Sequence, residues 1–91
     1  MGRRTLASCS LGLVPKQEIY LQKDAKILGV VNTNGPRILF EKDERANETE
    51  GYSIRCYNIG QELLHDDSYI FLGAVNYLNG FTALAVYYKK L

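Results

Sequence analysis

Two Asn-Gly dipeptides, Asn34-Gly35 and Asn79-Gly80, restrict the fold of this chain more than any other feature. Both residues of such a pair adopt positive φ readily, which a two-residue type I′ turn between antiparallel strands requires. Each dipeptide lies between segments rich in β-branched and aromatic residues, so each predicts a β-hairpin. The predicted partners are 26–33 with 36–42, and 68–78 with 81–88.

The rest of the chain also favours strands. Segment 51–59 predicts a third strand pair, 17–21 a further short strand, and 5–13 an additional one. Pro36 lacks an N–H, so we expect it to begin a strand or to lie on an edge. Segment 60–67 is short and has no cap, which indicates a loop with at most one helical turn.

These elements predict an all-β fold, either a small antiparallel β-sandwich or a barrel-like meander of about six strands. The 91 residues allow one domain, 1–91, because a chain this short has little room for a second core. Residues 1–13 are either an extra strand or a flexible basic arm.

The last predicted hairpin is apolar on both faces, whereas a strand with one wet face alternates apolar and polar residues. Its second face is therefore covered either by the rest of a sandwich or by another subunit. Self-association buries area that one small core cannot supply, so we expect a homo-oligomer, with a dimer favoured. The predicted interface residues are Tyr69, Phe71, Tyr77, Leu84, Val86 and Tyr88.

The net charge of +1 conceals an uneven distribution along the chain. Eight acidic and three basic residues between Glu41 and Asp67 give −5, and the remaining eight bases and two acids give +6. This balance disfavours a uniformly basic nucleic-acid binder. The acidic stretch is either a set of solvated loops or a surface for a basic partner. In the second case the partner-binding flank is Asp43, Glu44, Glu48 and Glu50.

No catalytic triad order, phosphate loop or dinucleotide fingerprint is present, so we expect no enzymatic activity and no cofactor. His65 lies near Glu62, Asp66 and Asp67, where a general base or a hard-metal site competes with the simpler interpretation of a hydrated turn. We predict no membrane segment, since no apolar run approaches about 18 residues. We also predict no metal site, because the spacing of Cys9 and Cys56 fits no metal-binding pattern. Without an export signal, Cys9 and Cys56 are expected to stay reduced in a cytosol.

The seven tyrosines have two interpretations. Tyrosine is a good strand residue, so packing in a core or interface accounts for most of them. It is also common at binding surfaces, where its ring can stack on a base while an arginine holds a phosphate. The residues that would form such a nucleotide pocket are Arg37, Arg55 and Tyr57.

Five short stretches occur in a recognisable order from Pro15 to the end of the chain. They are Gln17-Glu18-Ile19-Tyr20-Leu21, Ala25-Lys26-Ile27-Leu28-Gly29-Val30-Val31, Asn34-Gly35, Tyr52-Ser53-Ile54-Arg55 and Tyr69-Ile70-Phe71-Leu72-Gly73, with an acidic loop before the fourth. Over residues 15–91 this order resembles a family of small phage-encoded proteins of unknown function. The chain departs from the family at Asn58-Ile59-Gly60-Gln61, where a Gly-Thr-Gly-His stretch is expected, and at its end, Tyr87-Tyr88-Lys89-Lys90.

The resemblance implies a viral accessory protein in the bacterial cytoplasm and supplies no catalytic residues. We therefore expect a non-enzymatic protein that binds and inhibits a host protein, as an anti-defence inhibitor of the anti-CRISPR kind does. The alternatives are an oligomeric sponge that sequesters a nucleotide signal, and a minor virion or assembly protein. Direct nucleic-acid binding is not expected.

Overall fold

Seven antiparallel strands make up the fold, which confirms the all-β prediction. The structure is a computed structural model and describes residues 3–77 and 82–91. Within those ranges the chain forms no helix, and so none that could cross a membrane. The strands are β1 (Arg4–Ser10), β2 (Lys16–Gln22), β3 (Lys26–Asn32), β4 (Pro36–Asp43), β5 (Thr49–Asn58), β6 (Ile70–Tyr77) and β7 (Thr82–Lys90).

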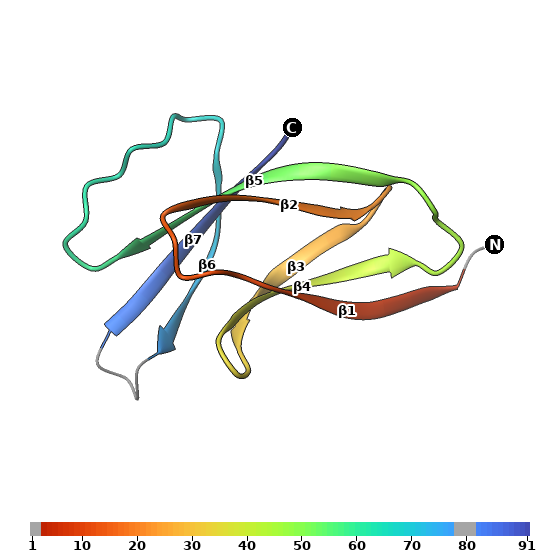
Figure 1. The fold of residues 1–91 in the computed structure, drawn as a ribbon, viewed down its shortest axis with the longest axis horizontal. Helices are drawn as coiled ribbons and strands as arrows, with labels where there is room; N and C mark the ends of the chain where they lie inside the picture. The colour runs from red at the N-terminus through yellow and green to blue at the C-terminus, as the bar shows by residue number, and fades with distance from the viewer. Residues whose placement is uncertain (1–2, 78–81) are drawn as a thin grey trace.

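The strands form two sheets that pack as a sandwich (Figure 1). One sheet has three strands in the order β1-β4-β3, and the other has four in the order β2-β5-β7-β6. Only β3–β4 and β6–β7 pair with their neighbours in sequence, so the fold is not a simple meander. The strand number exceeds the predicted one because the N-terminal segment forms β1 rather than a flexible arm.

The β3–β4 hairpin has the backbone that its Asn-Gly pair predicts. Asn34 and Gly35 both have positive φ, 54° and 107°. The turn is longer than expected, because Asn32 pairs with Pro36 and three residues lie between them rather than two. Pro36 begins β4, one of the two predicted positions, although β4 is a central strand. Asn79-Gly80 lies outside the described residues.

The core lies between the sheets and takes every second side chain from most strands. Ile38 of β4, Ile54 of β5 and Val86 of β7 are completely buried in it. Burial of one aliphatic side chain contributes about 1.5–3 kcal/mol, so these three positions are central to stability. Burial also raises the pKa of the Cys56 thiol to about 11, and both cysteines are free.

Four of the six predicted interface residues face this core. Leu84 and Val86 are buried in it, and Tyr77 and Tyr88 pack against it. The assignment of Leu84 and Val86 to an oligomer interface is therefore wrong, whereas Tyr77 and Tyr88 remain partly exposed. The two-residue period of a strand separates its faces, but it does not reveal which face another sheet covers. Only Tyr69 and Phe71 lie outside the core cluster.

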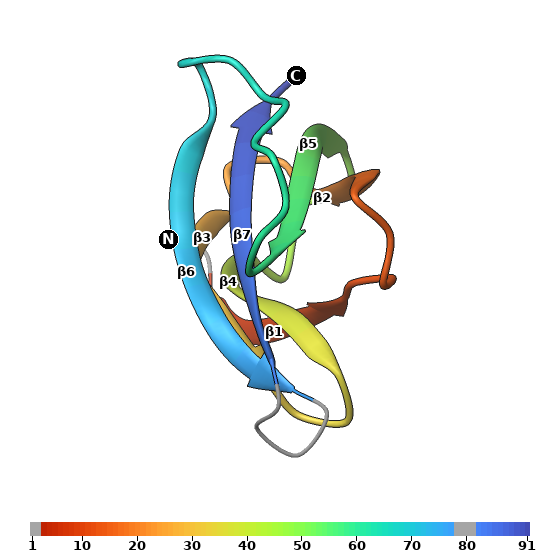
Figure 2. The same ribbon diagram turned by 90° about the vertical axis from the view of Figure 1, so that its left-hand side faces the viewer.

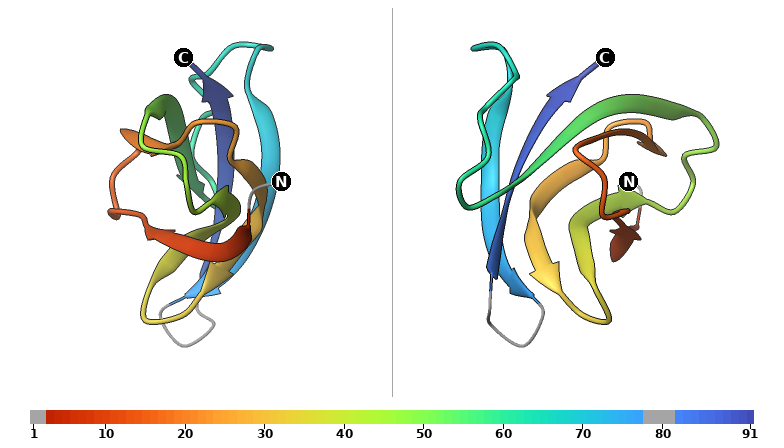
Figure 3. Two further views of the ribbon diagram at one scale, coloured as in Figure 1. Left: turned by 90° about the vertical axis from the view of Figure 1, so that its right-hand side faces the viewer. Right: turned by 60° about the vertical axis from the view of Figure 1, so that its left-hand side comes forward.

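One side of the sandwich is closed by β3 and β6, which lie next to each other (Figure 3). The Asn32 side chain donates a hydrogen bond to the carbonyl of Asn76 at 2.6 Å. A Cβ atom at Gly73 would lie 3.1 Å from the side chain of Val30, so the two strands approach closely there. Each has a register shift, at Ile27/Gly29 in β3 and at Phe71/Gly73 in β6.

We expect Ile54→Val to lower the free energy of unfolding by about 1 kcal/mol, because it removes a methyl group from a filled site. Ile59→Val is the matched control, since Ile59 is 80% exposed, and we expect no measurable change from it. Urea unfolding of both variants checks this. Equal effects would contradict the placement of the core.

Candidate functional site

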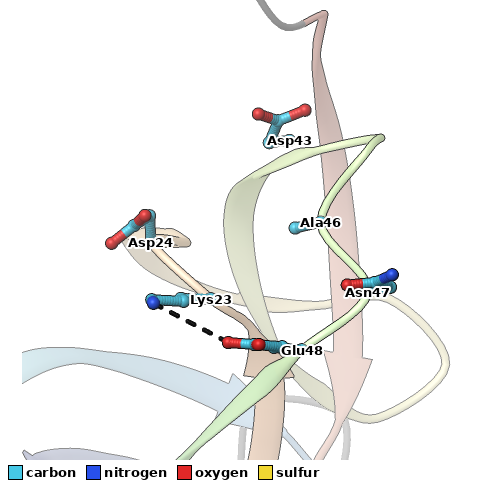
Figure 4. Close-up of a pocket in the computed structure, with 6 residues that line it drawn as sticks. All are labelled: Lys23, Asp24, Asp43, Ala46, Asn47 and Glu48. Atoms are coloured by element: carbon cyan, nitrogen blue, oxygen red, sulfur yellow. Dashed lines mark ion pairs between the residues drawn. The ribbon is translucent and has the colours of Figure 1, made fainter.

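The predicted acidic flank is assembled at one end of the sandwich. Asp43 ends β4, where it pairs with Arg4, and Glu44 follows it, whereas Glu48 directly precedes β5 and Glu50 is its second residue. Next to them is a hollow of about 130 Å³ (Figure 4). It is lined by Lys23, Asp24, Asp43, Ala46, Asn47 and Glu48.

Each of the four flank carboxylates has a donor within the molecule, which reduces what it can offer to a partner. Figure 4 shows Glu48 turned toward Lys23, while Asp43 lies apart from both. The pairs are Glu48 with Lys23 (3.7 Å), Glu50 with Lys90 (2.9 Å), Asp43 with the N–H of Arg45 (2.9 Å) and Glu44 with the Thr5 hydroxyl.

Among the residues described, no three His, Cys, Asp or Glu side chains are placed to hold a metal ion.

The uneven charge along the sequence is largely compensated in space. Four ion pairs join an acid of the stretch 41–67 to a base from outside it. Exposed pairs of this kind contribute about 0–1 kcal/mol each, so they matter for the surface potential more than for stability. Besides the two at Glu48 and Glu50, they are Arg4–Glu41 (3.3 Å) and Lys89–Asp66 (3.9 Å).

A second candidate site lies on the face of the four-stranded sheet that points away from the core, here called the outer face. Residues directly opposite one another in antiparallel strands share a face, so the register defines its rows. One row is Lys16, Arg55, Tyr87 and Phe71, and the next is Tyr57, Ala85 and Ala74.

The segment between β5 and β6, residues 59–69, crosses this outer face in front of β5 and β7 (Figure 2). We call it the β5–β6 loop. The ring of His65 contacts Tyr87, Tyr69 and Tyr57, with centroids at 4.2, 5.2 and 5.4 Å. The Tyr57 hydroxyl accepts the N–H of Leu64 at 3.1 Å and lies 3.1 Å from Nδ1 of His65. Aromatic packing and these hydrogen bonds hold the loop against the sheet.

Polar groups occupy the other end of the outer face. The hydroxyls of Ser53 and Tyr69 are hydrogen-bonded at 2.6 Å, and the ammonium of Lys89 lies 5.1 Å from the Tyr69 ring. The hydrogen bond to Ser53, followed by Arg55, lowers the pKa of the Tyr69 phenol, although partial burial opposes the shift. Nε of Arg55 is buried and has no hydrogen-bond partner among the described residues.

Large apolar side chains gather on and beside the outer face. Ile59, Leu63, Leu64 and Phe71 are 54% to 80% exposed, and we call these four the apolar patch. A mainly apolar hollow of about 240 Å³ lies between the β5–β6 loop and the sheet. Exposed apolar side chains that border one hollow, as Ile59 and Leu63 do, favour an interaction site over a scattered exposed residue. The residues that line the hollow include Ile59, Leu63, Ala74, Ala83 and Ala85.

The three residues of the predicted nucleotide pocket do not come together. Arg55 and Tyr57 share the outer face, on β5. Arg37 belongs to β4 in the other sheet, where its Nε donates to the Ser8 hydroxyl at 2.9 Å. A single pocket made from all three is therefore wrong, because the two arginines lie on strands of different sheets.

His65 has a different environment from the one that sequence neighbours suggest. Glu62 makes no hydrogen bond to it in the described chain, whereas three tyrosine rings surround it. Tyr57, Tyr69 and Tyr87 are far apart in sequence, and no local pattern places them beside one histidine. The sequence offers only an indirect signal for this cluster: the three tyrosines lie on predicted strands, and His65 lies in the predicted loop 60–67.

Comparison of the chain with protein-family models, with curated proteins and with solved structures gives no match. The two candidate sites differ in how much of their surface is free to meet a partner. Of these, the acidic flank is largely paired within the molecule, whereas the apolar patch is exposed.

We expect Tyr57→Phe to loosen the β5–β6 loop, because it removes the hydroxyl that binds Leu64 and His65. The loss should be about 1 kcal/mol, the usual contribution of a hydrogen bond of this kind. Hydrogen exchange at the Leu64 amide should become faster. Tyr20→Phe, at an exposed position of β2, is the control and should leave that amide unchanged. Identical exchange in Tyr57→Phe would contradict the anchoring role.

The pair between Glu50 and Lys90 predicts a pH dependence. The backbone N–H of Asp24, and then Lys90, hold the pKa of Glu50 below its ordinary value of 4.5. A carboxyl group whose pKa is lowered by folding stabilises the fold at pH values above its ordinary pKa of 4.5. This contribution to the free energy of unfolding disappears as the pH falls through the lowered pKa of the folded state. Glu50→Gln should therefore be less stable than the wild type at neutral pH, and the gap should narrow in acid. Thermal unfolding against pH checks this, with Glu62→Gln as the unpaired control.

Proposed function

We propose that this protein is a non-enzymatic binding protein that attaches to a partner protein through the apolar patch and the adjoining outer face. The observation that carries the proposal is the exposure of Ile59 and Leu63 at one apolar hollow, together with that of Leu64 in the same loop and Phe71 on β6. Exposing large apolar groups to water is unfavourable, and contact with a partner would remove that cost.

The chemistry around the patch suits protein recognition. Interface positions with the largest energetic effect are enriched in tyrosine and arginine, and the outer face contains Tyr57, Tyr69, Tyr87 and Arg55. The β5–β6 loop is held by His65, so it would lose little conformational freedom on binding. Ordered aromatic groups beside an apolar hollow give a partner side chain a place to insert.

The partner we propose is a host protein in the bacterial cytoplasm, which the bound protein would inhibit. This assignment follows the resemblance to small phage proteins, and the absence of a catalytic motif agrees with action by occlusion. The acidic flank has a smaller part in this scheme. Its carboxylates are engaged by Lys23 and Lys90, so they would modulate the approach of a basic partner rather than anchor it.

A nucleotide ligand is the second candidate, favoured by one observation. Lys16 and Arg55 lie directly opposite each other on the outer face, and neither has a carboxylate partner among the described residues. Two adjacent cations without a counterion favour an anionic group, and nearby tyrosines offer rings for stacking. Calorimetric titration with cyclic and linear nucleotides tests this alternative.

We expect the double variant Ile59→Glu/Leu63→Glu to weaken partner binding about tenfold or more, because each charge must be desolvated in the contact. The measurement is quantitative affinity capture from bacterial extract with the wild type and the variant as bait. Leu13→Glu is the control, since Leu13 is 65% exposed but lies in the segment between β1 and β2. Partners that bind all three baits alike would contradict the assignment.

A further inference from the structure

The two sheets have four edge strands, and their edges are not equally protected. β3 and β6 each contain a register shift and lie against each other, which closes that side of the sandwich. β2 carries Lys16 and Glu18 on its exposed face, and charges on an edge strand discourage strand addition. β1 pairs with β4 over its whole length without a shift, and its one charged side chain, Arg4, stands at its start.

The hydrogen bonds at the two ends of β1 reveal which backbone groups are free. The backbone N–H of Glu44 donates to the carbonyl of Arg3, and the backbone N–H of Leu11 donates to the carbonyl of Pro36. Both pairs continue the register of β1 with β4. Hydrogen-bonded pairs alternate in an antiparallel ladder, so the odd-numbered residues of β1 bond to β4. The even-numbered residues therefore direct their N–H and C=O groups away from β4.

These outward groups form an open edge. They belong to Arg4, Leu6, Ser8 and Ser10, and no backbone hydrogen bond satisfies them within the described chain. The side chains of the same residues are exposed, with Leu6 at 63%. An unprotected edge of this kind is a template for another strand.

We propose that β1 pairs antiparallel with β1 of a second copy of this chain, about a twofold axis, to give one continuous six-stranded sheet in the dimer. The outward residues are even-numbered, and the register that overlaps all of β1 places Leu6 opposite the partner's Ser8 and Arg4 opposite the partner's Ser10. Ala7 then lies on the axis, opposite the partner's Ala7, in a pair without hydrogen bonds.

A second copy fits this edge better than an unrelated strand for two reasons. The only charged residue of β1, Arg4, faces a serine in the full overlap, so no like charges meet. The side chains of Ala7 and Cys9, on the core side of β1, are only partly buried in one copy. The strand of a second copy would bury more of their surface. This site is separate from the apolar patch, so the inference stands independently of the proposed function.

The first test measures mass in solution by size-exclusion chromatography with light scattering. The wild type should elute at twice the 10.3 kDa of one chain at high concentration. Leu6→Pro removes an outward N–H and no bond to β4, so it should give a folded monomer. Leu6→Ala keeps that N–H and should remain dimeric. Circular dichroism checks that each variant is folded.

The second test uses cross-linking in a Cys9→Ser background and does not depend on the proline variant. Cα atoms of a non-hydrogen-bonded pair lie about 4.5 Å apart, within the range of a disulfide. Ala7→Cys should therefore oxidise to a covalent dimer. Leu6→Cys is the matched control and should not, because each Leu6 faces the partner's Ser8 rather than the partner's Leu6.

The outcomes that overturn the proposal are distinct. A wild type that stays monomeric at the highest concentration overturns it, as does equal cross-linking of the two cysteine variants. A dimer that survives Leu6→Pro and dissociates in Ile59→Glu/Leu63→Glu would place self-association on the apolar patch instead. A monomer that captures an extended peptide along β1 would assign the edge to a different partner and reject the homodimer.

Discussion

The pairing of β5 with both β2 and β7 is the constraint on which the rest of the structure depends. As the inner strand between them, β5 sends its even-numbered side chains, such as Ile54 and Cys56, into the core. Its odd-numbered side chains, Ser53, Arg55 and Tyr57, necessarily point the other way. The same ten residues therefore build the hydrophobic centre and the polar and aromatic part of the outer face.

The β5–β6 loop then covers part of this face and completes the second candidate site. Without it, Tyr57 and Tyr87 would be aromatic residues on a wet sheet. His65 packs against both rings and fastens the loop, and this leaves Ile59 and Leu63 exposed beside the alanines of β6 and β7. The candidate site therefore depends on a loop that aromatic contacts between distant parts of the chain hold in place.

Sequence reasoning was most successful where the signal is local. Asn34-Gly35 produced the positive φ values and the hairpin that it predicts, and the acidic flank came together because its residues are close in the chain. It failed where partners are distant. Leu84 and Val86 looked like interface residues because alternation marks two faces of a strand without saying which is covered. Arg37 and Arg55 were grouped by residue type, yet their strands belong to different sheets.

The sequence by itself determined that this protein is built of antiparallel strands, where its first hairpin turns, and where its acidic residues lie. Those properties follow from backbone preferences and from neighbours within a few residues. The tertiary structure decided that Lys23 and Lys90 offset the acidic charges, which rings surround His65, and that β1 keeps an open edge. These depend on strand pairings across long stretches of chain, whose register is fixed only when both sheets bury their apolar faces together.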